Sequence, residues 1–346
     1  MDKISVIGLD LAKNVFQVHG ANASGKKVLS RQLKRADVLE FFAALPACRV
    51  GMEACGGAHE WARRIEALGH SVKLMAPQYV KAYVQGNKTD ARDAAAICEA
   101  AGRDSVPTVA IRSRDGQQVQ AWHRVREGWM KQCTATANQM RGLLAEFGQA
   151  ITPGMRRLRS EVRAWQDKAR ADLGLLCGLI DELLANLAEL EERIAKVDRQ
   201  IIAVHQENAA CRLIESIPGV GIMTATAIVA SFGQAEMFRD GRKFACALGL
   251  TPREQSSGGK QVLLGISKRG NGYVRKLLVH GARAVLRARM EKPAYADDWA
   301  VKLAARRGHN IAVCALAAKN ARRIWAMLQS GEIFRADYAQ TPFVCA

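Results

Sequence analysis

The chain has 346 residues, of which 49% are hydrophobic, and its 51 Lys and Arg outnumber 33 Asp and Glu to give a formal net charge of +18. That much apolar sequence excludes a disordered chain and suits two or three domains with cores of their own. The positive charge predicts a polyanionic partner, DNA or RNA, although a soluble basic protein of another class has the same composition.

The first third of the chain has the pattern of an α/β domain. Apolar or alternating runs predict strands at 4–10, 14–20, 28–33, 48–53 and 71–76, and helices at 35–45, 58–68 and 89–102, the last with Thr89 as N-cap. Three antiparallel strands followed by alternating strands and helices is the order of a ribonuclease-H-like fold. We therefore predict such a domain over residues 1–112.

Four acidic residues fall at the ends of these predicted elements. Asp10 ends the first strand, and Glu53 ends a later one. Asp90 and Asp93 lie three apart in the first turn of a helix, so they face the same way. We expect the four carboxylates to converge, and convergent carboxylates need a cation, which their hard oxygens select as Mg²⁺ or Mn²⁺. Taken singly, each acid is also explained as a strand-end turn residue or a charge at a helix N-terminus.

Residues 113–208 are almost wholly helical in pattern, charged and rich in Leu. Apolar residues recur there at a spacing close to a heptad, at Leu183, Leu187, Leu190, Ile194, Val197 and Ile201. Such a seam either pairs helices in a coiled coil that serves assembly or packs one long helix within its own chain. The sequence favours neither interpretation.

Residues 209–334 form a third section, in which Gly, Lys and Arg separate helical segments, and residues 335–346 are a tail without a readable pattern. The run IPGVG, which contains Gly219 and Gly221, precedes a helix predicted at 223–232 and is typical of a helix-hairpin-helix. Its backbone N–H groups would hold a phosphate without reading sequence. A tight turn between two helices with no ligand explains the same pattern.

Two serines, Ser256 and Ser257, precede a pair of glycines where backbone can approach a ligand closely. Cationic side chains follow on the same turn-rich path, at Lys260, Lys268, Arg269 and Arg275. A serine hydroxyl surrounded by cations is a candidate phosphoryl acceptor. The residues alone favour a simpler interpretation, a basic loop that grips phosphates with the serines as hydrogen-bond donors.

The nine cysteines are widely spaced and include no CxxC pair, which argues against a disulfide framework or a zinc site and is typical of a reducing compartment. The sequence opens without a signal-peptide pattern, and no apolar stretch reaches the length of a bilayer. We therefore expect a cytoplasmic protein with no membrane partner.

Several segments carry a family resemblance. VIGLDLAKNVFQVHG, GMEACGGAHEWAR and NKTDARDAAAICEA resemble the N-terminal RuvC-like domain of the DEDD insertion-sequence transposases of the IS one-ten family. Their C-terminal transposase domain is resembled by two further segments, IPGVGIMTATAIVASFG and FACALGLTPREQSSGGKQVLLGISKRGNGYVRKLLVHGARAV. Within the second segment, the sequences SSGGK and LLVHGARAV are similar to the IS eleven-eleven branch of the family. The resemblance covers most of the chain and runs in family order.

The resemblance implies a catalytic set made of Asp10, Glu53, Asp90, Asp93 and a nucleophilic Ser256, with Ser257 as the adjacent alternative. It implies RNA-guided strand cleavage and exchange of donor and target DNA through a covalent phosphoserine, with Mg²⁺ held by the acids. It further implies a structured non-coding guide RNA as partner, and an active site shared between the subunits of a homo-oligomer, a dimer or a tetramer.

Two other classes of protein compete with this interpretation. A RuvC-like Holliday-junction or structure-specific endonuclease needs the clustered acids but not the C-terminal serine. A nucleoprotein scaffold that grips DNA or RNA through the helix-hairpin-helix and the basic turns does not need the four acids to converge.

Overall fold

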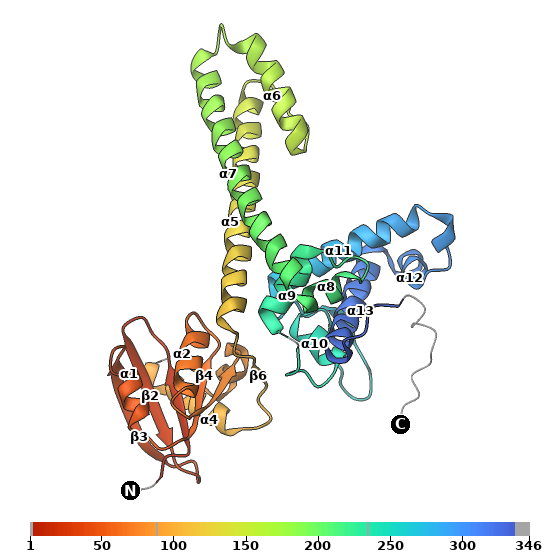
Figure 1. Cartoon of the computed structure of the whole chain (residues 1–346). Helices are drawn as coiled ribbons and strands as arrows, with labels where there is room; N and C mark the ends of the chain where they lie inside the picture. The colour runs from red at the N-terminus through yellow and green to blue at the C-terminus, as the bar shows by residue number, and fades with distance from the viewer. Residues whose placement is uncertain (1–2, 88, 234, 336–346) are drawn as a thin grey trace. The chain divides into compact units, whose positions relative to one another are not determined.

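The computed structural model describes residues 3–87, 89–233 and 235–335 and divides into two compact units, Met1–Arg114 and Asp115–Ala346 (Figure 1). Within the described residues the fold is mixed α/β and mainly helical, as predicted, with a six-stranded and a two-stranded sheet. None of the described helices combines the length and apolarity that crossing a bilayer requires. The predicted tail lies outside the described residues from position 336 onward.

The first unit is built on a sheet with the strand order β3-β2-β1-β4-β5-β6. Its strands are β1 (Val6–Asp10), β2 (Val15–Ala21), β3 (Lys27–Lys34), β4 (Arg49–Glu53), β5 (Ser71–Met75) and β6 (Thr108–Val109). β1, β2 and β3 form an antiparallel meander, whereas β4 pairs in parallel with β1 and β5 in parallel with β4. The five strands predicted from the sequence are confirmed to within two residues, and the order is compatible with a ribonuclease-H-like domain.

Helices cover both faces of this sheet. Ile7 and Leu9 of β1 are buried in one core with Phe42 of α1 (Val38–Ala43) and Ala62 of α2 (Ala58–Glu66). Side chains alternate between the faces of a strand, so Gly8 belongs to the opposite face, and α4 (Asp90–Gly102) packs against it there. The short helices α3 (Pro77–Val80) and η1 (Lys81–Tyr83) precede α4.

The second unit begins with three long helices, α5 (Arg114–Glu146), α6 (Met155–Ala169) and α7 (Gly174–Glu207). α5 and α7 run along each other, as Figure 1 shows, and share a core with α6. Leu187 and Ile194 of the near-heptad seam are buried there with Met140 of α5 and Leu158 of α6. The sequence left two interpretations of this seam open, and the structure supports the one in which the long helix packs within its own chain.

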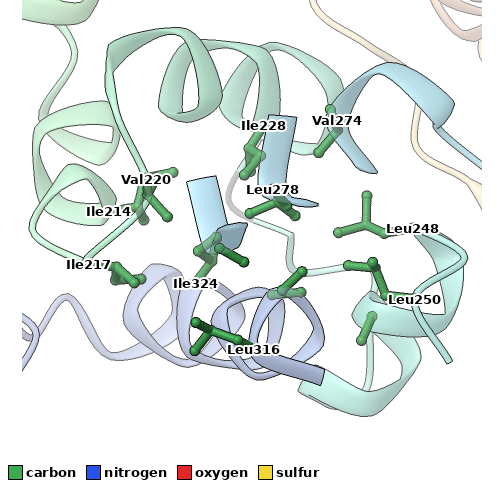
Figure 2. Close-up of a cluster of buried hydrophobic side chains, with 14 of the residues drawn as sticks. Ile214, Ile217, Val220, Ile228, Leu248, Leu250, Val274, Leu278, Leu316 and Ile324 are labelled. Carbon is green, nitrogen blue, oxygen red and sulfur yellow. The ribbon is translucent and has the colours of Figure 1, made fainter. Parts of the chain in front are cut away.

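The rest of the second unit is a globular helical core. Its elements are α8 (Ala209–Glu215), α9 (Ile222–Phe232), α10 (Gly241–Ala247), β7 (Pro252–Glu254), β8 (Leu263–Ile266), α11 (Gly272–Met290), η2 (Pro293–Tyr295), α12 (Trp299–Arg307) and α13 (His309–Ser330). Figure 2 shows how Ile214, Ile228, Leu278 and Ile324, which come from four helices, meet in one buried cluster. The β7–β8 hairpin is exposed beside this core.

Candidate active site

Two of the predicted acids lie at the carboxyl ends of neighbouring parallel strands. β1 and β4 pair with Leu9 opposite Met52, so Asp10 and Glu53 follow at the same edge of the sheet. Leu9 and Met52 are buried on the face that α1 and α2 cover. Because side chains alternate along a strand, Asp10 and Glu53 point to the other face, which α4 covers. Both acids are partly exposed, so a ligand has access to them.

The direction of α4 follows from its contacts with β1. A Cβ atom on Gly8 would lie 2.1 Å from the carbonyl oxygen of Ala94, so the helix backbone rests directly on the strand. One turn later, the Cys98 thiol reaches the carbonyl oxygen of Val6 at 3.6 Å. The helix therefore runs antiparallel to β1, and its N-terminus lies toward the strand end that carries the acids.

The first turn of α4 carries the other two acids, Asp90 and Asp93. Thr89 is the N-cap, as predicted, and its side chain accepts a hydrogen bond from the backbone N–H of Arg92 at 3.3 Å. Two negative charges in this turn are favoured by the helix dipole. The capped start of α4 thus holds a second pair of carboxylates on the face and toward the edge where the strand-end pair lies.

The thiol of Cys55 lies within electrostatic reach of both strand-end carboxylates. Partial burial raises the pKa of its thiol, and the negative charges of Glu53 and Asp10 raise it further. Both carboxylates are therefore close enough to the Cys55 thiol to disfavour its negatively charged form. A raised pKa keeps the thiol protonated, and a protonated thiol is a poor metal ligand. The donors offered at this edge are carboxylate oxygens, which suit a hard divalent cation such as Mg²⁺ or Mn²⁺.

The acids share a face and an edge without forming a closed metal cage. Within residues 3–87, 89–233 and 235–335, no three His, Cys, Asp or Glu side chains are grouped so that they could hold a metal ion. The expected convergence of all four carboxylates on one point is therefore not seen in these side-chain positions. The Asp90 side chain is exposed, whereas Asp10, Glu53 and Asp93 are half-buried.

Ser256 lies in the second unit, on the β7–β8 hairpin. The hairpin tip is closed by two backbone hydrogen bonds between Ser257 and Lys260, at 3.0 and 3.3 Å. Just before the tip, the exposed Ser256 hydroxyl donates a hydrogen bond to Oε1 of Glu254 at 2.5 Å. Its oxygen accepts one from the backbone N–H of Val262 at 3.3 Å. The serine is thus exposed to a ligand and already paired with a carboxylate.

Glu254 is a candidate that the sequence analysis missed. Hydrogen bonds from Ser256 and, more weakly, Gln261 lower the pKa of its carboxyl group, so it is ionised at neutral pH. The alternation Glu-x-Ser would have signalled the contact, since residues two apart in a strand lie on the same side. The glycines that follow give this segment the pattern of a turn-rich path, which hides the short strand.

The four cations predicted around the serines have different surroundings. Lys260, Lys268 and Arg269 are exposed, and Lys268 has a positive φ of 56°. Arg275 is partly buried, and its Nη1 donates to the carbonyl oxygens of Leu248 at 3.0 Å and Arg269 at 2.9 Å. Arg275 therefore ties the basic turn to the end of α10, whereas the other three cations extend into solvent.

The predicted helix-hairpin-helix turn connects α8 to α9, and it packs tightly on α11. Gly219 has a φ of +88°, and a Cβ atom there would lie 2.8 Å from the carbonyl oxygen of Gly281. This close approach of two backbones accounts for Gly219 without a ligand. Gly221 is the N-cap of α9, and a Cβ atom there would meet nothing within 4 Å. A side chain at position 221 would therefore extend into open space, so close packing does not account for this glycine.

Two family models match this chain. One, for a DEDD transposase of the IS110 type, matches residues 7–148, which include all four acids. The other, described as Transposase IS116/IS110/IS902 family, matches residues 211–297, which include the α8–α9 turn and Ser256. The two matches follow each other in the order that the resemblance predicted.

Whole proteins match as well. A probable family 20 transposase of Pseudomonas aeruginosa is 48% identical over 96% of this chain and 99% of its own length. The transposase for insertion sequence element IS1111A of Coxiella burnetii is 41% identical over 97% of this chain and 92% of its own. The transposase for insertion sequence element IS1328 of Yersinia enterocolitica is 34% identical over 96% and 99%.

Proposed function

We propose a mechanism for this chain, which belongs to the IS116/IS110/IS902 family of transposases and is a DNA transposase of an insertion sequence. In this mechanism the Ser256 hydroxyl attacks a DNA phosphate, and the cut strand is held as a phosphoserine until it is joined to a new end. One observation carries the proposal: Ser256 is exposed on a hairpin with Lys260 at its tip, and its hydroxyl is hydrogen-bonded to a carboxylate.

The acids of the first unit supply the metal site in this mechanism. A DEDD transposase domain works with a divalent metal cation, and we assign Mg²⁺ to Asp10, Glu53, Asp90 and Asp93. The shared edge and face of the sheet on which Asp10 and Glu53 lie support this assignment. When bound, such a cation offsets negative charge on the transferring phosphate.

DNA is the substrate of a transposase, and a structured guide RNA is the partner that we propose would choose donor and target sites by base pairing. The net charge of +18 suits both polyanions. The exposed Lys260, Lys268 and Arg269 would contact phosphates beside Ser256, and the open space at Gly221 would admit another. Arg275 contributes by fixing the turn that carries Arg269.

We propose three functional sections for the chain: residues 1–112 for metal chemistry, 113–208 for assembly and 209–334 for strand transfer. The buried seam is unavailable for assembly into a homo-oligomer. Exposed apolar side chains elsewhere suit that purpose better, such as Leu175 of α7 (97% exposed) and Phe147 in the turn after α5 (51% exposed).

A strand-exchange assay with the element's DNA ends, its RNA, target DNA and Mg²⁺ tests the mechanism. Ser256→Ala should bind DNA and RNA as the parent does but yield no recombinant, because the attacking oxygen is gone. Ser257→Ala is the matched control and should retain activity. Asp10→Asn should also be inactive while folded, since it removes a ligand charge without changing volume. Recombination by Ser256→Ala would exclude the serine, and DNA cut to free ends would indicate a plain nuclease.

A further inference from the structure

Glu254 and Ser256 form a pair whose geometry is that of a base and its nucleophile. Glu254 ends strand β7, and Ser256 follows two residues later on the same side of the hairpin. Their oxygens are 2.5 Å apart, within hydrogen-bond reach for proton transfer. The amide of Gln261 donates to the same Glu254 oxygen at 3.3 Å, from the opposite arm of the hairpin.

We propose that Glu254 is the general base that takes the proton of the Ser256 hydroxyl during strand transfer. This inference rests on the proposed function, because it presupposes that Ser256 attacks DNA. A serine hydroxyl is a weak nucleophile at neutral pH and needs an adjacent base. Glu254 meets that need within its own hairpin.

Bonds and protons balance in both steps of strand transfer. The Ser256 Oγ–P bond forms, the P–O bond to the leaving strand breaks, and the hydroxyl proton moves to Oε1 of Glu254. The leaving oxygen takes a proton from water. In the rejoining step, the hydroxyl of the incoming strand attacks phosphorus and gives its proton to water, while the departing Oγ takes its proton back from Glu254. The carboxylate is restored at the end of the cycle.

The neighbours of the pair suit both halves of this cycle. The N–H of Val262 donates to Ser256 Oγ at 3.3 Å and stabilises negative charge that develops there. The hydrogen bonds from Ser256 and Gln261 lower the pKa of Glu254, so the base is ready at neutral pH. Ser257 is three residues from Glu254 and begins the tip turn with Lys260, which makes Ser256 the serine that the base serves.

The test is the rate of covalent adduct formation between the full chain and labelled donor DNA in one turnover, measured from pH 4 to pH 8. Glu254→Gln keeps the shape and a hydrogen-bond acceptor but cannot take a proton, so it should slow the adduct on the order of 10²-fold or more. Glu254→Asp should recover part of that loss. The parent rate should fall toward the acid end of this range as Glu254 is protonated, and the fall should be smaller in Glu254→Gln, which lacks that carboxylate.

The matched control is Glu291→Gln, which neutralises an exposed carboxylate that pairs with Arg287 at the end of α11. This control should leave the adduct rate and its pH profile unchanged. DNA affinity and circular dichroism of each variant report on binding and folding. An adduct on Ser256 that forms in folded Glu254→Gln at the parent rate would overturn the role of Glu254 alone. A parent protein that forms no adduct would overturn the proposed function as well.

Discussion

Replacing Gly8 with alanine should displace α4 and disturb the acid site without touching any acid. The added methyl group would lie 2.1 Å from the carbonyl oxygen of Ala94 and 2.4 Å from the backbone nitrogen of Cys98. Both are backbone atoms, which cannot rotate aside as the end of a side chain can. Since a Cβ atom essentially never lies closer than 3.0 Å to such an atom, the helix has to move by about 1 Å.

The loss in the free energy of unfolding follows from the same distances. Overpacking a core usually costs about 1–3 kcal/mol, and a backbone obstacle places Gly8→Ala at the upper end. In a domain of about 100 residues, 1 kcal/mol lowers Tm by about 4–8 °C, so about 3 kcal/mol should lower it by roughly 12 °C or more. A displacement of about 1 Å at a reacting centre costs on the order of 10²-fold in rate.

Thermal unfolding and hydrogen exchange of residues 90–102 measure these effects. Gly8→Ala should lower Tm and the protection of α4, and strand exchange should fall with them. Gly56→Ala is the matched control, because a Cβ atom on Gly56 would meet nothing within 4 Å. Parent values of Tm and of α4 protection in Gly8→Ala would show that α4 does not rest on β1 and that this contact does not set the place of Asp90 and Asp93.

Three further predictions concern the long helices and the partner. Leu187→Ala truncates a fully buried side chain and should lower the free energy of unfolding, measured in urea, by about 2–5 kcal/mol. Leu175→Ala truncates an exposed side chain and should lower it little. Equal urea midpoints for the two variants would contradict the packed seam. Burial, and to a lesser extent the charge of Arg126, lowers the pKa of His123 to about 4. The unfolded chain therefore binds a proton that the folded one does not as pH falls from about 6.5 to 4, so stability is lost across that window, and His123→Gln should lose less of it between pH 7 and 5. The element's own RNA should bind more tightly than unrelated RNA of equal length at one salt concentration, and both should weaken with added salt; equal affinities would argue against a dedicated guide.

Local sequence patterns predict the structure correctly where contacts between neighbouring residues determine it. Ile7 and Leu9 alternate with Gly8 because one face of β1 is buried under α1 and α2, and that alternation is visible in the sequence. Thr89 is readable as an N-cap because its hydrogen bond closes within three residues. The ends of the elements, and with them the shared edge of Asp10 and Glu53, were predictable for this reason.

Contacts between distant segments could not be predicted in the same way. Arg275 looks like a free cation in the sequence, yet its guanidinium donates hydrogen bonds to two backbone carbonyls that only the folded turn brings close to it. The seam through Leu187 is equally suited to a partner chain or to its own, and the burial against α5 and α6 decides between them. Glu254 was missed because its role depends on recognising a three-residue strand.

The claim that Ser256 bonds covalently to DNA is tested most directly by mass spectrometry of the linked peptide. The full chain is incubated with its RNA, donor DNA and Mg²⁺, denatured, digested with nuclease and trypsin, and the peptide 254–260 is fragmented to place the added nucleotide. Our account predicts the nucleotide on Ser256, in the parent and in Ser257→Ala alike. A nucleotide on Ser257, or DNA cut to free ends with no linked peptide, would contradict it.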